Sequence, residues 1–180
     1  MENKSSTISY YKNGNINFEK YHKDGKYHRE NGPAIICYYN DGKIEEEYWY
    51  IDDKLHREDG PANISYYENG NILKEGYYVN DKAHRTDGPA IVSYYENGNK
   101  LMEHWRVDNK FHRENGPAEI CYYEDGKVFF ERYYKNDKLH NEDGPAVIEY
   151  DEDGNIIKKE YYFNNVEINE LQQIVIEATK

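Results

Sequence analysis

The sequence predicts an all-β protein, an elongated repeat of stacked antiparallel β-hairpins with a period of 28 residues. Two observations set the period, because a fixed interval of this length is typical of repeat architectures. A histidine opens a phrase of the type HREDGPA at His28, His56, His84, His112 and His140. Asn-Gly or Asp-Gly pairs recur at the same interval and end at Gly14, Gly42, Gly70, Gly98, Gly126 and Gly154. A third observation sets the class, because 21 tyrosines together with Ile and Val favour strands.

One unit, taken from Gly60, has the sequence GPANISYY, ENG, NILKEGYYV and NDKAHRTD. We interpret these pieces as a strand, a tight turn, a second strand and a loop. An Asn-Gly pair between alternating apolar runs predicts a type I′ turn, in which both central residues have positive φ. We expect a single repeat domain over residues 1–180. Its parts are a half unit at about 7–27 and full repeats at about 28–55, 56–83, 84–111, 112–139 and 140–167.

Side chains alternate across a strand, so each face can be read separately. On the first strand Ala62, Ile64 and Tyr66 share a face, and every full repeat carries a similar set there. The other face varies and holds Asn63 and Ser65 in this repeat. We expect the recurrent face to be packed and the variable face to be largely solvated. The sheet is expected to be an open twisted sheet or a solenoid.

The C-terminal segment has a different pattern. Asn169 and Gln172 form a capping-box pair, in which Asn169 is the N-cap. Leu171, Ile174, Val175 and Ala178 then follow with helical spacing and form one apolar stripe. The pattern predicts a short α-helix at about 170–179. It serves either as a cap over the end of the stack or as a docking helix for a partner.

The recurrent histidines do not form a metal site in this architecture. Equivalent residues two strands apart are roughly 9–10 Å from each other, and zinc needs donors about 2.0–2.3 Å away. A catalytic pair is also disfavoured. His56 lies beside Arg57, Glu58 and Asp59, but neither Ser nor Cys recurs beside it as a nucleophile. We therefore expect no enzyme, no cofactor and no metal. The loop His, the Arg and the strand Glu are interpreted as a structural rung between repeats.

The formal net charge of −12 argues against nucleic acid and anionic lipid as partners, and it favours basic proteins. Cys37 and Cys121 occupy equivalent positions three repeats apart, roughly 29 Å from each other at the usual strand spacing. They are expected to be reduced thiols, because a disulfide needs a much closer approach. The sequence has neither a membrane-spanning run nor a signal-peptide pattern, so we expect a cytoplasmic protein without direct membrane insertion.

A second tyrosine follows the core tyrosine in four repeats, at Tyr39, Tyr67, Tyr95 and Tyr123. These side chains are expected to point to the opposite face. A regular row of exposed tyrosines is a candidate surface for protein binding, because Tyr combines a large contact area with a polar tip. The alternative is that the row packs on neighbouring repeats or on loops.

The phrase YYENGNILKEGYYVNDK resembles MORN-type repeats and is most similar to the variant in YwqK-type, antitoxin-like bacterial proteins. The HREDGPA phrase resembles the extended form in repeat proteins of giant amoeba-infecting viruses. The resemblance covers about residues 7–166 and implies a non-enzymatic scaffold, in the host cytoplasm if the source is viral. It also implies hairpins at 34–51, 62–79, 90–107, 118–135 and 146–163.

The sequence therefore favours a non-enzymatic repeat scaffold for protein–protein interaction. The alternative is an antitoxin-like or immunity-like inhibitor of a basic partner protein, which the YwqK resemblance and the acidic charge motivate. Exposed sheet edges also predict association between copies of the chain.

Overall fold

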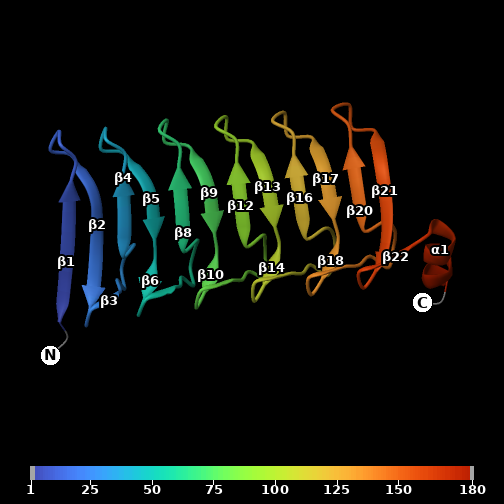
Figure 1. The fold of residues 1–180 in the computed structure, drawn as a ribbon, viewed down its shortest axis with the longest axis horizontal. Helices are drawn as coiled ribbons and strands as arrows, with labels where there is room; N and C mark the ends of the chain where they lie inside the picture. Colours follow the sequence, from blue (N-terminus) through green and yellow to red (C-terminus); the bar gives the residue numbers. More distant parts are fainter. Residues whose placement is uncertain (1–2, 179–180) are drawn as a thin grey trace. The chain divides into compact units, whose positions relative to one another are not determined.

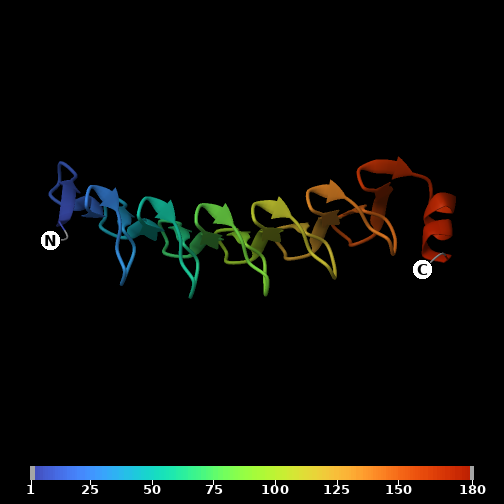
Figure 2. The ribbon, with the colours of Figure 1, turned by 90° about the horizontal axis from the view of Figure 1, so that it is seen from below.

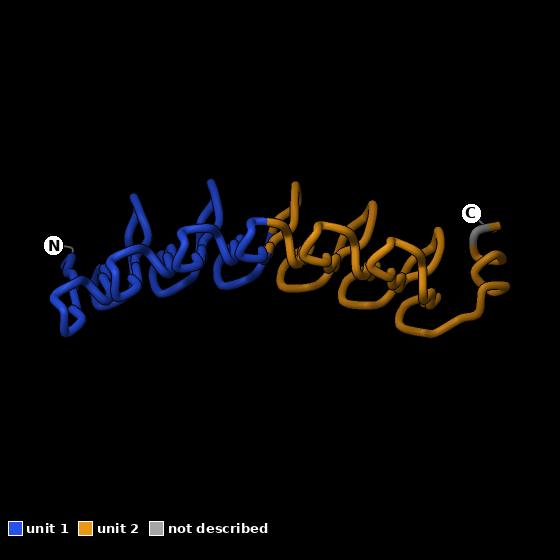
Figure 3. Tube along the Cα trace, turned by 90° about the horizontal axis from the view of Figure 1, so that it is seen from above, with its two compact units in different colours: residues 1–84, 93–98 blue, residues 85–92, 99–180 orange. Residues whose placement is uncertain are grey.

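The fold is nearly all β, as the sequence predicts, and a computed structural model describes residues 3–178. The chain forms two compact units, which Figure 3 shows in different colours. The first unit contains residues up to 84 together with 93–98, and the second contains 85–92 and the residues from 99 onward. The strand order in each unit is linear, so each unit is an open antiparallel sheet (Figure 1).

Each full repeat contributes one long hairpin. Its first strands are β4 (Ile35–Tyr38), β8 (Asn63–Tyr66), β12 (Ile91–Tyr94), β16 (Glu119–Tyr122) and β20 (Val147–Tyr150). Its second strands are β5 (Ile44–Tyr48), β9 (Ile72–Gly76), β13 (Lys100–His104), β17 (Val128–Arg132) and β21 (Ile156–Phe163). Ile64 pairs with Glu75 within the β8–β9 hairpin and with Glu47 of β5 on its other side. These strands lie within the hairpins that the family resemblance implies.

The turn of the long hairpin differs from the predicted type. Tyr67 and Asn71 close the loop, since the Tyr67 amide donates to the Asn71 carbonyl at 2.9 Å. The Gly70 amide donates to the Tyr67 carbonyl at 2.9 Å, and only the glycine of the Asn-Gly pair has positive φ, at +91°. This geometry is a type I turn followed by a left-handed glycine in a three-residue loop. The prediction of a type I′ turn was wrong because it placed only two residues in the loop.

Type I′ turns occur instead in a second, shorter hairpin, within the segment that the sequence suggested was a loop. Asn80 and Asp81 both have positive φ, at 50° and 65°, as that turn requires. The strands of these short hairpins are β6 (Tyr50–Ile51) and β7 (Lys54–Leu55), β10 (Tyr78–Val79) and β11 (Lys82–Ala83), β14 (Arg106–Val107) and β15 (Lys110–Phe111), and β18 (Tyr134–Lys135) and β19 (Lys138–Leu139). The HREDGPA loop begins only after this hairpin.

The two ends of the chain depart from the repeat. At the N-terminal end β1 (Lys4–Tyr10) pairs with β2 (Ile16–Lys23), and β3 (Lys26–Tyr27) pairs with the end of β2. The first unit has the strand order β1-β2-β4-β5-β8-β9. The second has the order β13-β16-β17-β20-β21-β22, in which β22 is Val166–Ile168.

The core is thin and is built around small residues. The alanine of each GPA triplet is fully buried, at Ala34, Ala62, Ala90, Ala118 and Ala146. The variable face is not largely solvated, which corrects the expectation, because Asn63 and Ser65 are each only 8% exposed. The bulky Tyr48 pairs with Asn63 in the adjacent strand and stacks on Tyr50 of the short hairpin. Large side chains of the second strands therefore cover the small residues of the first.

The C-terminal helix α1 (Glu170–Ala178) forms as predicted, and residue 179 of the predicted range lies outside the described residues. Its capping box is confirmed. The Gln172 amide donates to Asn169 Oδ1 at 2.9 Å, and the Asn169 amide donates to Gln172 Oε1 at 2.9 Å. The helix contacts the last loop, but through Gln173 and not through the apolar stripe. Gln173 is 1% exposed, and its Nε2 donates to the Glu142 carbonyl at 2.9 Å.

The two kinds of turn give a test of this backbone assignment. Gly70→Ala should lower the free energy of unfolding by about 1 kcal/mol, because a Cβ is strained at this φ. This loss of stability comes from the backbone conformation alone, since an added Cβ would meet no atom within 4 Å. Asn80→Gly should leave stability unchanged or raise it slightly. Urea denaturation measures both, and an increase in stability for Asn69→Gly would contradict the type I assignment.

Candidate functional site

The four tyrosines predicted to bind a partner are half-buried, and the hydroxyls of three of them connect repeats. Tyr39 donates to the Tyr66 carbonyl at 2.6 Å, Tyr67 to the Tyr94 carbonyl at 2.8 Å, and Tyr123 to the Tyr150 carbonyl at 2.9 Å. Tyr95 is also half-buried, and its carbonyl accepts the Gly98 amide of its turn at 2.9 Å. Three members of the row thus have a structural role, and each ring keeps some exposed surface.

The core tyrosines form a second link between repeats. Tyr38 donates to Glu19 at 2.8 Å, Tyr66 to Glu47 at 2.8 Å, Tyr94 to Glu75 at 2.9 Å and Tyr150 to Glu131 at 3.0 Å. We call this series the Tyr–Glu ladder. Burial and the hydrogen bond to Glu19 raise the pKa of Tyr38 to about 12, and burial and Glu131 do the same for Tyr150. The ladder therefore depends on tyrosine hydroxyls that keep their protons and donate them to glutamate oxygens.

The histidines hold the next hairpin turn along the chain, so they have a structural role as expected, but their partners differ from those expected. Nδ1 of His56 accepts the Asn80 amide at 3.3 Å, and Nδ1 of His140 accepts the Asn164 amide at 3.3 Å. Nε2 of His140 lies 3.2 Å from Glu142 of its own loop. Each of these two imidazoles thus links the start of its own loop to the next hairpin turn along the chain. Both ring nitrogens of His140 are thus engaged within the fold.

The arginine of the loop forms a contact that the sequence analysis missed. Arg57 lies over the ring of Trp49 with Cζ 4.3 Å from its centroid, and its Nη1 donates to the Pro61 carbonyl at 3.3 Å. A Cβ on Gly60 would approach Arg57 Cζ to 2.9 Å, so the loop glycine leaves room for the guanidinium. The signal was an aromatic residue eight positions before each loop Arg and a glycine three positions after it.

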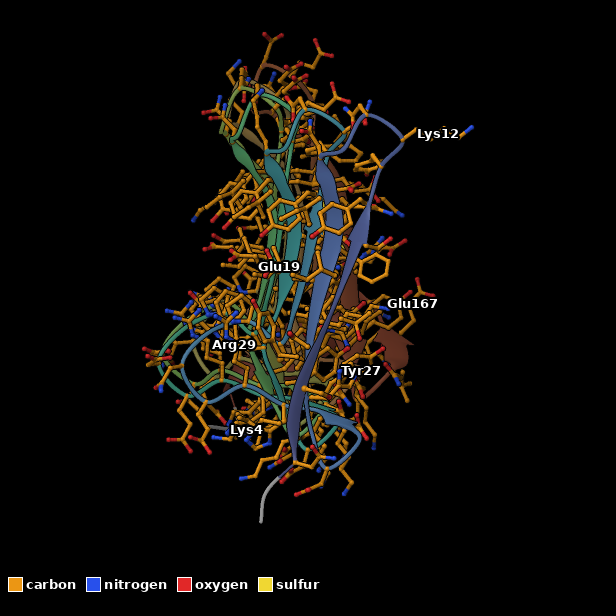
Figure 4. All side chains as sticks on the ribbon, turned by 90° about the vertical axis from the view of Figure 1, so that its left-hand side faces the viewer. Lys4, Lys12, Glu19, Tyr27, Arg29 and Glu167 are labelled. Carbon is orange, nitrogen blue, oxygen red and sulfur yellow. The ribbon has the colours of Figure 1, made fainter. Side chains whose placement is uncertain are left out.

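Figure 4 shows Arg29 and Glu19 on one side of the first sheet and Tyr27 on the other.

The two cysteine thiols are not activated as nucleophiles, because burial raises the pKa of both. Burial raises the pKa of the Cys121 thiol to about 11, so it is protonated and a poor nucleophile at neutral pH. Cys37 and Cys121 are free thiols, as expected. Within residues 3–178, no group of three or more His, Cys, Asp or Glu side chains could hold a metal ion. Over the same range no helix has the length and apolar character to cross a bilayer.

Consecutive HREDGPA loops leave clefts between them. In the first unit a cleft of about 620 Å³ is lined by Glu30, Trp49, Arg57, Glu58 and Asp59, among others. The side chains of Glu58 and Asp59 are 88% and 84% exposed at its rim. A cleft of about 460 Å³ in the second unit has Glu114, Glu142 and Asp143 in equivalent places. These clefts present carboxylates to solvent and can receive cationic groups.

The cleft nearest the N-terminal end is chemically different. It has a volume of about 460 Å³, and Lys4 and Lys23 line it where Gly32 and Ile51 line the next cleft. Lys23 lies 3.8 Å from Glu30. The first cleft therefore differs in charge from the two acidic clefts, although the scaffold around it is repeated.

Three segments of the chain match the family model described as MORN repeat variant, at residues 63–80, 118–136 and 146–164. Each segment covers a long hairpin, and the first two extend into the short hairpin that follows. MORN repeats are commonly interaction modules for proteins or membranes, and the family is a non-catalytic one. No curated protein matches the chain.

The Tyr–Glu ladder can be tested by a double-mutant cycle on Tyr66 and Glu47. Tyr66→Phe and Glu47→Ala should each lower the free energy of unfolding, with a coupling energy of about 1 kcal/mol between them. Tyr67→Phe is the matched control, because its hydroxyl donates to a carbonyl and not to Glu47. Urea denaturation gives the four free energies. Equal coupling of Glu47 to Tyr67 would contradict the ladder.

The ladder also predicts loss of stability in alkali. Tyrosine has a pKa of about 10 in an unfolded chain, and the folded pKa of Tyr38, Tyr122 and Tyr150 is raised to about 12. A raised pKa stabilises the fold fully below about pH 10, and this stabilisation is lost as pH rises through about 12. Tyrosinate absorbance and circular dichroism should change together above pH 10. Ionisation of all tyrosines near pH 10 with the β-structure intact would contradict the prediction.

Proposed function

We propose that this chain is a non-catalytic repeat module that binds other proteins. The observation that carries the proposal is that the recurrent polar side chains are engaged in holding the fold together. The imidazoles of His56 and His140, the guanidinium of Arg57, and Glu47 with its Tyr66 partner each hold one repeat or join two neighbouring repeats. The function then lies in the surface that this framework presents, as it commonly does in MORN repeats.

Tyr39, Tyr67, Tyr95 and Tyr123 are proposed as one contact row on that surface. A hydroxyl held by a carbonyl fixes the orientation of the ring before any partner binds, as for Tyr39 and Tyr67. A ring already ordered loses little conformational entropy on binding, and this favours affinity. The same bonds place the rings at regular intervals, which suits an extended partner surface.

The proposed partners are basic proteins. The loop carboxylates of Glu58, Asp59 and Glu114 are 88%, 84% and 72% exposed, and the chain has a net charge of −12. Such a surface speeds encounter with cationic partners at low ionic strength and repels acidic ones. The two free thiols suit a reducing compartment, so a cytoplasmic location is part of the proposal.

A second candidate is an immunity-like inhibitor of one basic protein. The exposed carboxylates of the loops favour it, because they could mask a basic functional surface on a single partner. This candidate differs from a scaffold in stoichiometry. It predicts one dominant, salt-sensitive complex, whereas a scaffold retains several proteins.

The tyrosine row is tested by comparing two pairs of substitutions in affinity capture. Tyr67→Ser with Tyr123→Ser removes the rings and should reduce the captured proteins at least about tenfold, as expected for aromatic anchors. Tyr67→Phe with Tyr123→Phe removes only the hydroxyl bonds and should keep most of the captured proteins while lowering the melting temperature. Capture is quantified by mass spectrometry.

Thermal melts of both double variants are the control for folding. Retention of every partner by a folded Ser variant would remove the tyrosine row from the proposal. Retention of nothing by the wild-type chain, at any salt concentration, would contradict the proposed function itself. A single partner that saturates at one copy per chain would favour the inhibitor.

A further inference from the structure

The apolar stripe of α1 faces solvent. The exposed fractions of Leu171, Ile174 and Val175 are 74%, 54% and 62%. Helix α1 instead turns Gln173 toward the last loop, where this side chain donates to the Asn141 and Glu142 carbonyls. Figure 2 shows α1 beyond β22 in the second unit. A short helix that holds its polar residue inward and three large aliphatic residues outward is typical of a docking surface.

A groove continues this apolar surface between α1 and the adjoining strand. It has a volume of about 410 Å³ and is lined by Phe163, Val166, Ile168, Gln172, Val175 and Ile176. All of these residues except Gln172 are apolar. Val175 belongs to both the groove and the helix stripe, and Val166 on β22 is 63% exposed beside them. The groove and the stripe therefore form one surface. We call it the C-terminal apolar surface, defined by Val166, Leu171, Ile174 and Val175.

The segment that carries this surface has described charges of one sign only. Among the described side chains of residues 164–178, the charged ones are Glu167 and Glu170, and both are exposed. Glu170 also accepts a hydrogen bond from the Tyr161 hydroxyl at 3.2 Å. A complementary partner therefore needs an apolar strip flanked by Lys or Arg.

We propose that the C-terminal apolar surface binds an amphipathic helix of a partner protein whose apolar stripe is flanked by basic residues. The proposal rests on the proposed function and names one site and one partner chemistry for it. A helix is the occupant that fits, because the rows of side chains on α1 can interdigitate with those of a second helix. The groove beside α1 receives the large apolar residues of that helix.

A second copy of the chain is a poorer occupant. A two-fold symmetric contact places the same surface of both copies together. Glu167 and Glu170 would then meet their own counterparts, and each chain carries a net charge of −12. The same acidic side chains attract a basic helix, so the charge pattern favours a different protein.

The test uses the full chain and a synthetic helical peptide as the probe. The peptide carries leucines at helical spacing on one face, with Lys and Arg on both sides of them. It should bind the wild-type chain, with an affinity that falls as salt rises. A peptide of the same composition in scrambled order should bind at least about tenfold more weakly, because it has the charge without the stripe. Titration is followed by calorimetry.

Two double variants identify the surface. Leu171→Ser with Val175→Ser should weaken the peptide at least about tenfold, as loss of apolar anchors does. Ile156→Ser with Ile157→Ser is the matched control. These residues are 48% and 61% exposed on β21 and do not line the groove, so the peptide should bind unchanged. Thermal melts check that both variants fold.

Three results would overturn the inference. They are equal binding of the scrambled peptide, unchanged binding by the folded Leu171→Ser/Val175→Ser variant, and a wild-type dimer in sedimentation that this variant converts to monomer. Failure here is distinct from failure of the proposed function. A chain that retains proteins through its tyrosine row but ignores the peptide contradicts only the helix surface, whereas a chain that retains no protein contradicts the proposed function.

Discussion

Hydrogen bonds that reach from one repeat to the next are the constraint on which the rest of the structure depends. The Tyr67 hydroxyl reaches a carbonyl 27 residues on, and the Leu55 amide reaches the Asp81 carboxylate 26 residues on. A single sheet buries few large side chains, and its fully buried apolar residues are the loop alanines. Hydrogen bonds at fixed sequence offsets therefore supply part of the stabilisation that a thick apolar core supplies in other folds. They also hold the period at 28 residues.

The sequence was sufficient for the architecture because each of its signals is local or periodic. The hairpins follow from alternation and turn glycines, and the helix follows from Asn169 and Gln172, which bond as the capping box requires. The contacts of Arg57 were missed because they depend on a loop folding back over a strand. Periodicity shows which residues share a face and does not show what covers that face. The turn type failed for a related reason, since loop length was inferred without the closing pair of Tyr67 and Asn71.

The same distinction applies to the candidate site. Recurrence indicated a structural role for the histidines, because five copies of one arrangement indicate a framework, and His56 and His140 do accept backbone amides of later hairpin turns. It left open whether Tyr67 is a surface residue or packs on a neighbouring repeat, and the structure shows its hydroxyl bonded to the next repeat. Two features of the described residues depart from the period, and they are the lysines of the first cleft and the apolar side of α1. A repeat protein gains specificity where it departs from its own period.

The last repeat shows how such departures fit together. Asn141 replaces the loop arginine, and its Nδ2 still donates to the Pro145 carbonyl at 2.9 Å, as Arg57 does to Pro61. The loop conformation is thus kept without a guanidinium. The Asn141 and Glu142 carbonyls of this loop then accept the Gln173 side chain and fix α1 in place. Because Gln173 is the residue turned inward, helical geometry turns Leu171 and Val175 outward. The changed loop and the exposed apolar stripe are therefore two parts of one arrangement.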